Sequence, residues 1–408
     1  MSWLNATEAL QLLDVRPQTL YANVSRKKIR AKPDPKDTRR SLYHEADVRR
    51  MARQRGGRRK ATAVAAAAIE WGDPILSSAI STVVDGRLYY RGQDAVVLSE
   101  EGSLEDVAGL LWGGGRLDGA DNARAALLVA SRESSPGTSP LARAFLALGS
   151  RAATDLSSYG RALTVLQSEA ASVLDVLADA LLEVGPAPPR ATGGGRAPRD
   201  REPAQNRRAT FLHERAAMSW GRPDAADIAR RALVLLADHE LNASTFATRV
   251  AVSTGAPLAA GVLSGLATLS GPLHGRASLG VLELVAGVKH VGAEVTVRDW
   301  LSQGRPIVGF GHPLYPQGDP RATALLQHFT LPKPYADLRD AIEDVIGERP
   351  NIDFALAALT KVFDLPQEAP LVLFALGRCV GWLAHALEQV TTGHPIRPRA
   401  RYVGPPIS

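Results

Sequence analysis

Four stretches in the second half of this chain place histidines, carboxylates and arginines in apolar or glycine-rich surroundings. Imidazole and carboxylate groups transfer protons, and the planar guanidinium group binds a carboxylate through two parallel hydrogen bonds. The stretches are residues 238–242 (DHELN), 271–275 (GPLHG), 309–321 (GFGHPLYPQGDPR) and 350–354 (PNIDF), followed near the C-terminus by Arg378 and Arg397.

The loop at 309–321 is the stretch around which the others are expected to gather. Gly309 and Gly311 lack a Cβ, so the backbone there can approach a ligand closely. Three prolines prevent a continuous helix and fix the direction of the loop. Such a loop holds His312 and Arg321 stiffly, as a proton donor and an anion clamp must be held.

Each of these side chains also has an ordinary structural interpretation. His239 could be a core histidine with satisfied hydrogen bonds, and His274 could cap a helix. Asp353 could be the N-cap of a helix that begins at Phe354. Arg378, within an apolar stretch, could be a buried ion-pair partner. Taken singly, the residues leave both interpretations open.

The composition favours a mainly α-helical protein. The 408 residues suffice for two or three domains, and only 5% of them are aromatic, while alanine, leucine and glycine abound. The single cysteine, Cys379, fits a reducing cytoplasm, and no export signal opens the chain, so we expect a cytoplasmic protein. No Cys or His pair has ligand spacing, so we expect no metal site.

Positive charge is concentrated at the N-terminus. Residues 1–60 contain 16 Lys and Arg against 6 Asp and Glu, whereas the remaining residues contain 32 against 36. The formal charge of +6 therefore comes from a basic head on a neutral-to-acidic body. Because this head also has apolar periodicity, the pattern favours a polyanion-binding module over a merely solvated tail.

The N-terminal segment has the pattern of a small DNA-binding module. Asn5 and Glu8 form a capping signature for a first helix, and residues 17–27 predict a second helix. Residues 29–43 predict a basic wing and 44–54 a third helix. The segment resembles winged helix-turn-helix modules of the MerR and excisionase type; a structural module that does not bind DNA is the alternative. The side chains expected to contact duplex DNA are Gln18, Thr19, Ser25 and Arg26.

Turn and linker signals divide the rest of the chain. A linker is expected at 56–68, and the Pro-, Gly- and Arg-rich stretch 185–208 is expected to be a mobile loop, since it cannot bury enough apolar surface to offset the entropy of ordering. The two-residue turn Asp85-Gly86 predicts a β-hairpin over 79–90. Helical patterns cover residues 104–112 and 123–130.

An uncharged run over residues 250–273 raises the question of a membrane span. Polar and glycine residues dilute the run, whereas a spanning helix is more uniformly apolar. We expect no transmembrane segment but a single buried helix, in which Gly261 and Gly265 allow close approach of another helix, as at a subunit interface.

Taken together, the motifs of residues 69–408 resemble the citrate synthase family. DHELNAS, GPLHG, GFGH…DPRA and PNID occur in the family's order, and GWLAH and RPRARYVG follow near the C-terminus as in bacterial members. The resemblance implies a mainly α-helical fold with a large and a small domain. It also implies condensation of acetyl-CoA with oxaloacetate to give citrate and CoA, with no cofactor beyond the CoA thioester itself.

The resemblance assigns the chemistry residue by residue. His274 matches the neutral histidine that hydrogen-bonds the thioester carbonyl as the enol forms, and a place at the start of a helix would help keep it uncharged. Asp353 matches the base that takes a proton from the acetyl methyl group. His312 matches the donor that protonates the oxaloacetate carbonyl as the carbon–carbon bond forms.

The implied substrates account for the remaining residues. Oxaloacetate has two carboxylates, so its pocket needs fixed cations. In the family the last arginine of the set crosses from the partner subunit, which implies a homodimer. The residues that match the oxaloacetate site are His239, Asn242, Arg321, Arg378 and Arg397. Those that match the CoA site are Val308, Gly309, Phe310, Gly311 and Leu314, with Arg349 as a phosphate contact.

The resemblance also predicts domain boundaries. The winged module is expected over 1–55. A large domain is expected over 69–278 and 373–408, and a small domain that carries His312 and Asp353 over 279–372. Closure of the small domain over bound oxaloacetate would exclude water before CoA arrives.

Two departures from the family pattern leave the acyl-chain preference open. Many bacterial relatives have GHRVYK where this chain has GHPLYP, and GPLHGRAS replaces a pattern with glycine and asparagine. A 2-methylcitrate synthase that uses propionyl-CoA is therefore one alternative. A transcriptional regulator whose synthase-like body senses CoA esters or dicarboxylates without turnover is the other.

Overall fold

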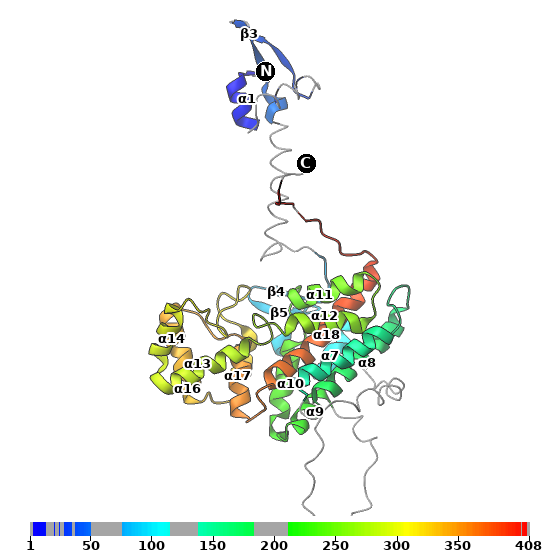
Figure 1. The fold of residues 1–408 in the computed structure, drawn as a ribbon, viewed down its shortest axis with the longest axis vertical. Helices are drawn as coiled ribbons and strands as arrows, with labels where there is room; N and C mark the ends of the chain where they lie inside the picture. The colour runs from blue at the N-terminus through cyan, green and yellow to red at the C-terminus, as the bar shows by residue number, and fades with distance from the viewer. Residues whose placement is uncertain are drawn as a thin grey trace, which may run out of the picture. The chain divides into compact units, whose positions relative to one another are not determined.

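The chain divides into two compact units, Met1–Ser77 and Ser78–Ser408 (Figure 1). The computed structural model describes residues 3–13, 20, 24, 28–34, 37–49, 76–114, 138–182, 211–400 and 402–405. Several predictions fall outside these residues and stay predictions: the linker at 56–68, the helix at 123–130, the mobile loop at 185–208, and the DNA-contacting side chains of Gln18, Thr19, Ser25 and Arg26.

The N-terminal unit contains a small antiparallel sheet in the order β1-β3-β2. The basic stretch predicted to be a wing forms the hairpin of β2 and β3. The predicted capping box is confirmed, because the Glu8 amide donates to Asn5 Oδ1 and the Asn5 amide donates to Glu8 Oε2, both at 2.9 Å. The elements are β1 (Trp3–Leu4), α1 (Ala6–Leu13), β2 (Ala31–Asp34) and β3 (Asp37–His44).

A compact apolar cluster holds this unit together. Leu20, in the predicted second helix, is buried in it, and Arg30 ties the hairpin to the following helical turn through Asp47 at 2.7 Å. The winged helix-turn-helix identity stays a prediction, since the outward face of its second helix is outside the described residues. The cluster consists of Ala9, Leu13, Leu20, Ile29, Tyr43 and Val48.

The second unit begins with the predicted β-hairpin. Asp85 and Gly86 both have positive φ, 50° and 72°, as the favoured hairpin turn requires. The helix predicted at 104–112 is also confirmed, because Ser103 forms a capping box and Gly113 ends the helix in the left-handed conformation. These elements are β4 (Ser81–Val84), β5 (Arg87–Tyr90), β6 (Gln93–Asp94), α4 (Ala95–Glu101) and α5 (Leu104–Trp112).

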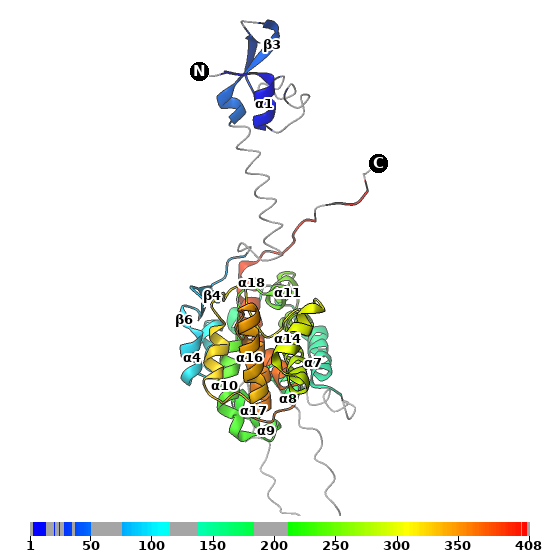
Figure 2. The same cartoon turned by 90° about the vertical axis from the view of Figure 1, so that its left-hand side faces the viewer.

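Among the described residues of this unit, the larger of two hydrophobic cores surrounds one long helix, α18 (Ala369–Thr392). This helix packs against α5, α8, α10, α11, α12 and α17 (Figures 1 and 2). Hydrogen bonds join it to distant parts of the chain: Trp112 Nε1 donates to the Val380 carbonyl at 2.9 Å, and the Ala79 amide donates to Glu388 at 2.7 Å. The other helices of this core are α7 (Pro140–Thr154), α8 (Leu163–Leu182), α9 (Leu212–Ser219), the 3-10 turn η3 (Pro223–Ala225), α10 (Ala226–Leu236), α11 (Ala243–Ser253), α12 (Leu258–Leu269) and α15 (Pro320–Leu326).

By length and composition alone, α18 would pass for a membrane span. However, 94% of its most apolar window is buried inside the protein. That burial is what a central core helix shows, and α18 is the single helix in the described ranges that is long and apolar enough to raise the question.

A second, smaller core lies within residues 281–358, where Phe310 and Phe354 pack edge to face with ring centroids 5.0 Å apart. Figure 1 shows its helices grouped at one end of the unit. The division of this unit into a large and a small domain, with its boundaries, stays a prediction. The helices are α13 (Ala277–Val291), α14 (Ala293–Ser302), α16 (Lys333–Ile346) and α17 (Ile352–Val362), and α17 also contributes to the larger core.

The prediction of one buried helix over 250–273 is wrong. The chain leaves α11 at Thr254, turns at Gly255 with φ of +84°, and begins α12 after Pro257. The expected close approach does occur, but within the chain. A Cβ at Gly261 would meet Val252 at 2.7 Å, and one at Gly265 would meet Trp382 at 2.8 Å, so the two glycines let α12 lie against α11 and α18.

Candidate active site

The loop that carries His312 is pinned to the residues just before α17. The Gly311 amide donates to the Arg349 carbonyl at 2.8 Å, and the Asn351 amide donates to the Gly309 carbonyl at 2.9 Å. Both glycines have positive φ, +83° at 309 and +64° at 311, and a Cβ at 309 would collide with Val281. Glycine is therefore required where the chain passes between the second core and the site.

His312 is fixed in one ring orientation by its own turn. The Tyr315 amide donates to the His312 carbonyl at 2.8 Å, closing a turn with Pro313 in its favoured second position. The Leu314 amide donates to His312 Nδ1 at 3.2 Å. Burial and the charge of Arg321 lower the pKa of His312 to about 4. The neutral ring therefore carries its proton on Nε2, which can act as a hydrogen-bond donor.

His239 lies against this loop, in the connection between α10 and α11. Its Nε2 is 2.8 Å from the hydroxyl of Tyr315, and its ring meets that of His312 edge to face with centroids 5.0 Å apart. Burial first, then the charges of Arg321 and Arg378, hold the pKa of His239 well below its usual value. The ring is neutral at pH 7.

His274 lies in the turn that precedes α13 rather than at the start of the helix itself. Its Nε2 is 2.9 Å from Ser244 Oγ, which also accepts a hydrogen bond from Trp382 Nε1 at 3.2 Å. The hydroxyl of Ser244 has one proton, shared between this ring and Asn242 Oδ1 at 2.8 Å. Burial and Arg378 lower the pKa of His274 to about 4, so this imidazole is also neutral.

Asp353 is the second residue of α17 and not its cap. Asn351 is the N-cap, and its Oδ1 accepts the Asp353 amide at 3.0 Å. Among the described residues no group hydrogen-bonds Asp353 Oδ1, although this oxygen is buried. Burial raises the pKa of Asp353 to about 7, against the opposing charge of Arg321. A half-buried carboxyl with a free oxygen and such a pKa can accept a proton near neutral pH.

Arg321 is a buried cation with a buried counter-charge. Its Nε and Nη2 donate to the two oxygens of Asp319 at 2.9 and 2.8 Å. Although burial opposes it, this carboxylate raises the pKa of Arg321. Asp319 Oδ2 also accepts the amide of Ile352 at 3.0 Å, which links the guanidinium to the first turn of α17 beside Asp353.

Arg378, in α18, is buried without such a partner. Its Nε donates to the Leu236 carbonyl at 3.0 Å, and no carboxylate of the described chain forms an ion pair with it. Burial lowers the pKa of Arg378 to about 10, although Asp238 opposes the shift. The alternative interpretation of Arg378 as a buried ion-pair partner is therefore not supported by the described residues.

The charge of Arg378 marks the point where the site residues meet. It lowers the pKa of His239, His274 and His312, and it lowers that of Asp353 against the effect of burial. Four side chains from four separate stretches are thus close enough to one guanidinium for its charge to act on them. The 238–242 and 350–354 stretches contact the 309–321 loop directly, whereas the His274 ring contacts Ser244 and Phe374.

Two predicted substrate residues remain apart from this cluster or have local partners. Asn242 is the N-cap of α11, and its Oδ1 accepts the Thr245 amide at 3.1 Å. Arg397 is exposed in the C-terminal stretch 393–400, which has no regular secondary structure. Their assignment to the oxaloacetate site stays a prediction.

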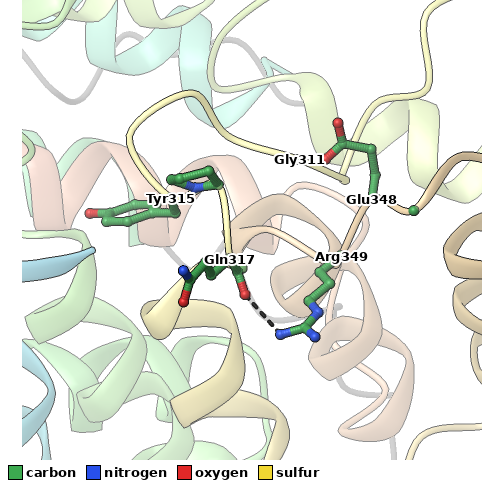
Figure 3. A pocket seen from close by; sticks show the side chains of 8 residues that line it. Gly311, Tyr315, Gln317, Glu348 and Arg349 are labelled. Carbon is green, nitrogen blue, oxygen red and sulfur yellow. Dashed lines mark hydrogen bonds between the residues drawn. The ribbon is translucent and has the colours of Figure 1, made fainter. Parts of the chain in front are cut away.

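Two of the six predicted CoA residues, Gly311 and Arg349, line a pocket of about 310 Å³. Arg349, on its wall, donates to the Gln317 carbonyl at 2.8 Å, and Figure 3 shows the Glu348 carboxylate extending toward Gly311. The Phe310 side chain is turned into the second core instead. Val308 and Leu314, which are close in sequence to Gly311, are half-buried. The pocket is lined by Gly311, Tyr315, Pro316, Gln317, Gly318, Gly347, Glu348 and Arg349.

Three residues that the sequence did not single out belong to the site. Ser244 holds the ring of His274, Tyr315 holds that of His239, and Asp319 compensates Arg321. Only Asp319 had a local signal, because an aspartate before proline is a typical N-cap, and it does cap α15. No metal-ligand group of three or more His, Cys, Asp or Glu side chains occurs in the described ranges.

The arrangement suits proton abstraction from a weak carbon acid beside an anionic partner. A carboxyl of pKa near 7 accepts the proton, while neutral imidazoles donate hydrogen bonds to oxygens on which charge develops. Two buried guanidinium groups supply the positive charge that a dicarboxylate needs. Because these groups are largely shielded from water, their interactions are stronger than on an open surface.

Comparison with known proteins identifies the family of the second unit. A family model described as "Citrate synthase, C-terminal domain" matches residues 70–399. The chain is 33% identical to a citrate synthase of Haloferax volcanii over 345 residues, which cover 78% of this chain and 90% of that protein. It is 38% identical to citrate synthase 2 of Bacillus subtilis over 194 residues, 45% of this chain and about half, 52%, of the relative.

Solved structures agree with this result. A citrate synthase from Thermotoga maritima superposes with a TM-score of 0.64 at 27% identity, covering 82% of this chain and 94% of the other. A citrate synthase from Thermoplasma acidophilum, in a ternary complex with carboxymethyl coenzyme A and oxaloacetate, shares the fold with a TM-score of 0.62 at 23% identity, covering 82% and 95%.

Proposed function

Because the chain belongs to the citrate synthase family, we propose that it condenses the acetyl group of acetyl-CoA with oxaloacetate and, with water, releases citrate and CoA. Members of this family are acyltransferase-type condensing enzymes that use CoA thioesters as substrates and need no cofactor. The observation that carries the proposal is that the buried charge of Arg378 acts on His274, His312 and Asp353, while Arg378 and His274 both contact the ring of Phe374.

The first step is enolisation of the thioester. A free oxygen of Asp353 takes a proton from the acetyl methyl group, and His274 donates a hydrogen bond to the carbonyl oxygen on which negative charge develops. For this donation the Ser244 hydroxyl donates a hydrogen bond to His274 Nε2, so that the neutral ring carries its single hydrogen on Nδ1. A neutral histidine is a better match than a cation to a weakly acidic enol.

The second step joins the two substrates. The enol carbon attacks the oxaloacetate carbonyl, while His312 donates its Nε2 proton to the forming alkoxide. Arg321 and Arg378 hold the two carboxylates, and hydrolysis of the citryl thioester then frees CoA. The exposed position of Arg397 supports the role expected of it, as a cation supplied to the partner's site in a homodimer. The 310 Å³ pocket with Arg349 on its wall supports the CoA assignment.

The test is release of thiol by the purified protein. With acetyl-CoA and oxaloacetate we expect CoA formation that depends on both substrates, measured with a thiol reagent. Absence of release with acetyl-CoA and with propionyl-CoA alike would contradict the proposed enzyme and leave the sensing body as the better interpretation. Faster turnover of propionyl-CoA than of acetyl-CoA would instead identify a 2-methylcitrate synthase.

A second candidate function, duplex DNA binding, is favoured by the basic hairpin of the N-terminal unit. The KPDPKDTRR stretch, residues 32–40, runs from β2 into β3, in a segment with 16 Lys and Arg against 6 Asp and Glu. A short hairpin that carries basic residues next to a helical core suits contact with a phosphate backbone.

Salt dependence and deletion test this second function. Two neutralised phosphates would lower duplex affinity about tenfold between about 50 and about 200 mM salt, because counterions are released on binding. Titration of labelled duplex at both salt concentrations measures this. Deletion of residues 1–60 should abolish DNA binding and leave thiol release intact. Binding that persists after the deletion would place the DNA site elsewhere in the chain. An affinity that does not change with salt would exclude binding through the phosphate backbone.

A further inference from the structure

Tyr315 is a buried residue at the centre of the site to which the proposed mechanism gives no role. It is 2% exposed, and its hydroxyl is 2.8 Å from His239 Nε2. Its ring lies 5.0 Å from that of His312 and 5.5 Å from that of His239, centroid to centroid. Three rings therefore form a triangle in which the phenol touches both histidines.

The geometry of this hydrogen bond leaves two proton arrangements. Either the phenol donates to Nε2 of His239, in which case the ring carries its hydrogen on Nδ1, or Nε2 donates to the phenol oxygen and Nδ1 carries a lone pair. Neither group is charged, since burial raises the pKa of Tyr315 to about 12 and keeps the pKa of His239 well below its usual value. A neutral imidazole has one donor and one acceptor, so the choice at one nitrogen fixes the other.

The negative charge of the proposed substrate decides between these two proton arrangements. Within the described chain, Tyr315 is the only hydrogen-bond partner of the His239 ring, so Nδ1 is the nitrogen left for a ligand. An ionised carboxylate only accepts hydrogen bonds, and a lone pair facing it would repel it. Nδ1 must therefore carry the hydrogen, and Nε2 must accept one from the phenol.

We propose that Tyr315 is a positioning residue that donates to His239 Nε2 and so fixes the tautomer in which Nδ1–H faces a carboxylate of oxaloacetate. This inference rests on the proposed function for the identity of the ligand. The turn from His312 to Tyr315 holds the phenol in place at 2.8 Å, amide to carbonyl. The guanidinium of Arg321, 5.3 Å from the ring centroid, makes the hydroxyl a stronger donor.

Replacement of Tyr315 by phenylalanine removes the donor and keeps the ring. We expect oxaloacetate to bind about tenfold more weakly, the value of one ordinary hydrogen bond, by calorimetry and by KM. We expect kcat and the KM for acetyl-CoA to change less than threefold. A matched control is Tyr335→Phe, since Tyr335 is equally buried and its hydroxyl donates to the Ala357 carbonyl at 3.3 Å in the second core. That variant should lose stability without losing affinity for oxaloacetate.

The tautomer is read directly by nitrogen NMR of protein labelled at its nine histidines. The ligand-free wild type should show hydrogen on Nδ1 of His239, assigned by its loss in His239→Gln, and Tyr315→Phe should show a mixture of tautomers. Hydrogen on Nε2 in the wild type would overturn the inference, as would unchanged oxaloacetate binding in Tyr315→Phe. If the wild type fails to bind oxaloacetate, the proposed function fails, and the NMR result still decides the role of Tyr315.

Discussion

Replacing Asp353 with asparagine is expected to lower the rate of thiol release from acetyl-CoA and oxaloacetate by about 10³-fold, because a positioned general base contributes about 10²- to 10⁴-fold. Asparagine has nearly the same shape and keeps the amide that Asn351 caps, so α17 should be preserved. Oxaloacetate should still bind, which calorimetry can measure in the absence of turnover. Turnover close to that of the wild type would show that another group is the base.

The pH dependence of the wild type offers an independent check on the same residue. Burial raises the pKa of Asp353 to about 7, and a base must be ionised to accept a proton. We therefore expect kcat/KM to rise as the pH increases through about 7. His274 and His312 have pKa values near 4 and stay neutral over this range, so they should not add a second step.

The same substitution should stabilise the protein. A carboxyl whose pKa is higher in the folded state than in the unfolded chain favours folding only while it is protonated, and this stability is lost as the pH rises from about 4 through about 7. Asparagine cannot ionise, so Asp353→Asn should melt at a higher temperature than the wild type at pH 8. The difference should shrink toward pH 4; a lower melting temperature at pH 8 would contradict the burial of an unpaired charge.

Substitution of either buried arginine, Arg321 or Arg378, should weaken oxaloacetate binding, but the two substitutions should differ in their effect on folding stability. Arg321→Gln and Arg378→Gln should each raise the KM for oxaloacetate about 100-fold, the equivalent of about 3 kcal/mol of charged hydrogen bonding. Arg321 compensates Asp319, so its loss leaves a buried carboxylate unpaired and should cost about 3 kcal/mol of folding free energy. Arg378 compensates no carboxylate through an ion pair among the described residues, so its loss should leave the melting temperature unchanged or raise it.

A third buried arginine provides the control for this pair. Arg249 pairs with Glu388 at 2.9 Å and with Gln389, and the one histidine that it contacts is His385, which is not among the predicted site residues. Arg249→Gln should lower stability as Arg321→Gln does, while the KM for oxaloacetate stays unchanged. If Arg378→Gln destabilises the protein as much as these two substitutions do, the charge of Arg378 stabilises the fold and is not reserved for a ligand.

Elements that are set by contacts between residues close in sequence could be predicted. The capping box at Ser103 and the turn at Asp85-Gly86 act over four residues or fewer, so their elements appear where the sequence placed them. In contrast, the run at 250–273 was misjudged because its apolar character suggested one helix. Gly255 and Pro257 within it were the local signal of a break.

The candidate residues of the site could be selected from motifs, but the contacts that hold them could not. His312 and Asp353 stand in short patterns, and the structure gives each a defined environment. The hydrogen bond from Tyr315 to His239 spans 76 residues, and that of Ser244 to His274 spans 30. Such pairs depend on how helices pack, which no local spacing encodes. The capping alternative for Asp353 is likewise excluded only by the fold, in which Asn351 is the N-cap of α17.

The place of α18 at the centre of the larger core has a consequence for biosynthesis. This helix occupies residues 369–392, so it leaves the ribosome after every helix that it packs against. Until then the apolar faces of α10, α11 and α12 have no central helix to pack against. The hydrogen bond from the Ala79 amide to Glu388, 309 positions downstream, cannot form either. Long-range closure of this kind folds slowly, and nascent chains with uncovered helices are prone to aggregate. The growing polypeptide is therefore a natural client for chaperones until its last helix emerges.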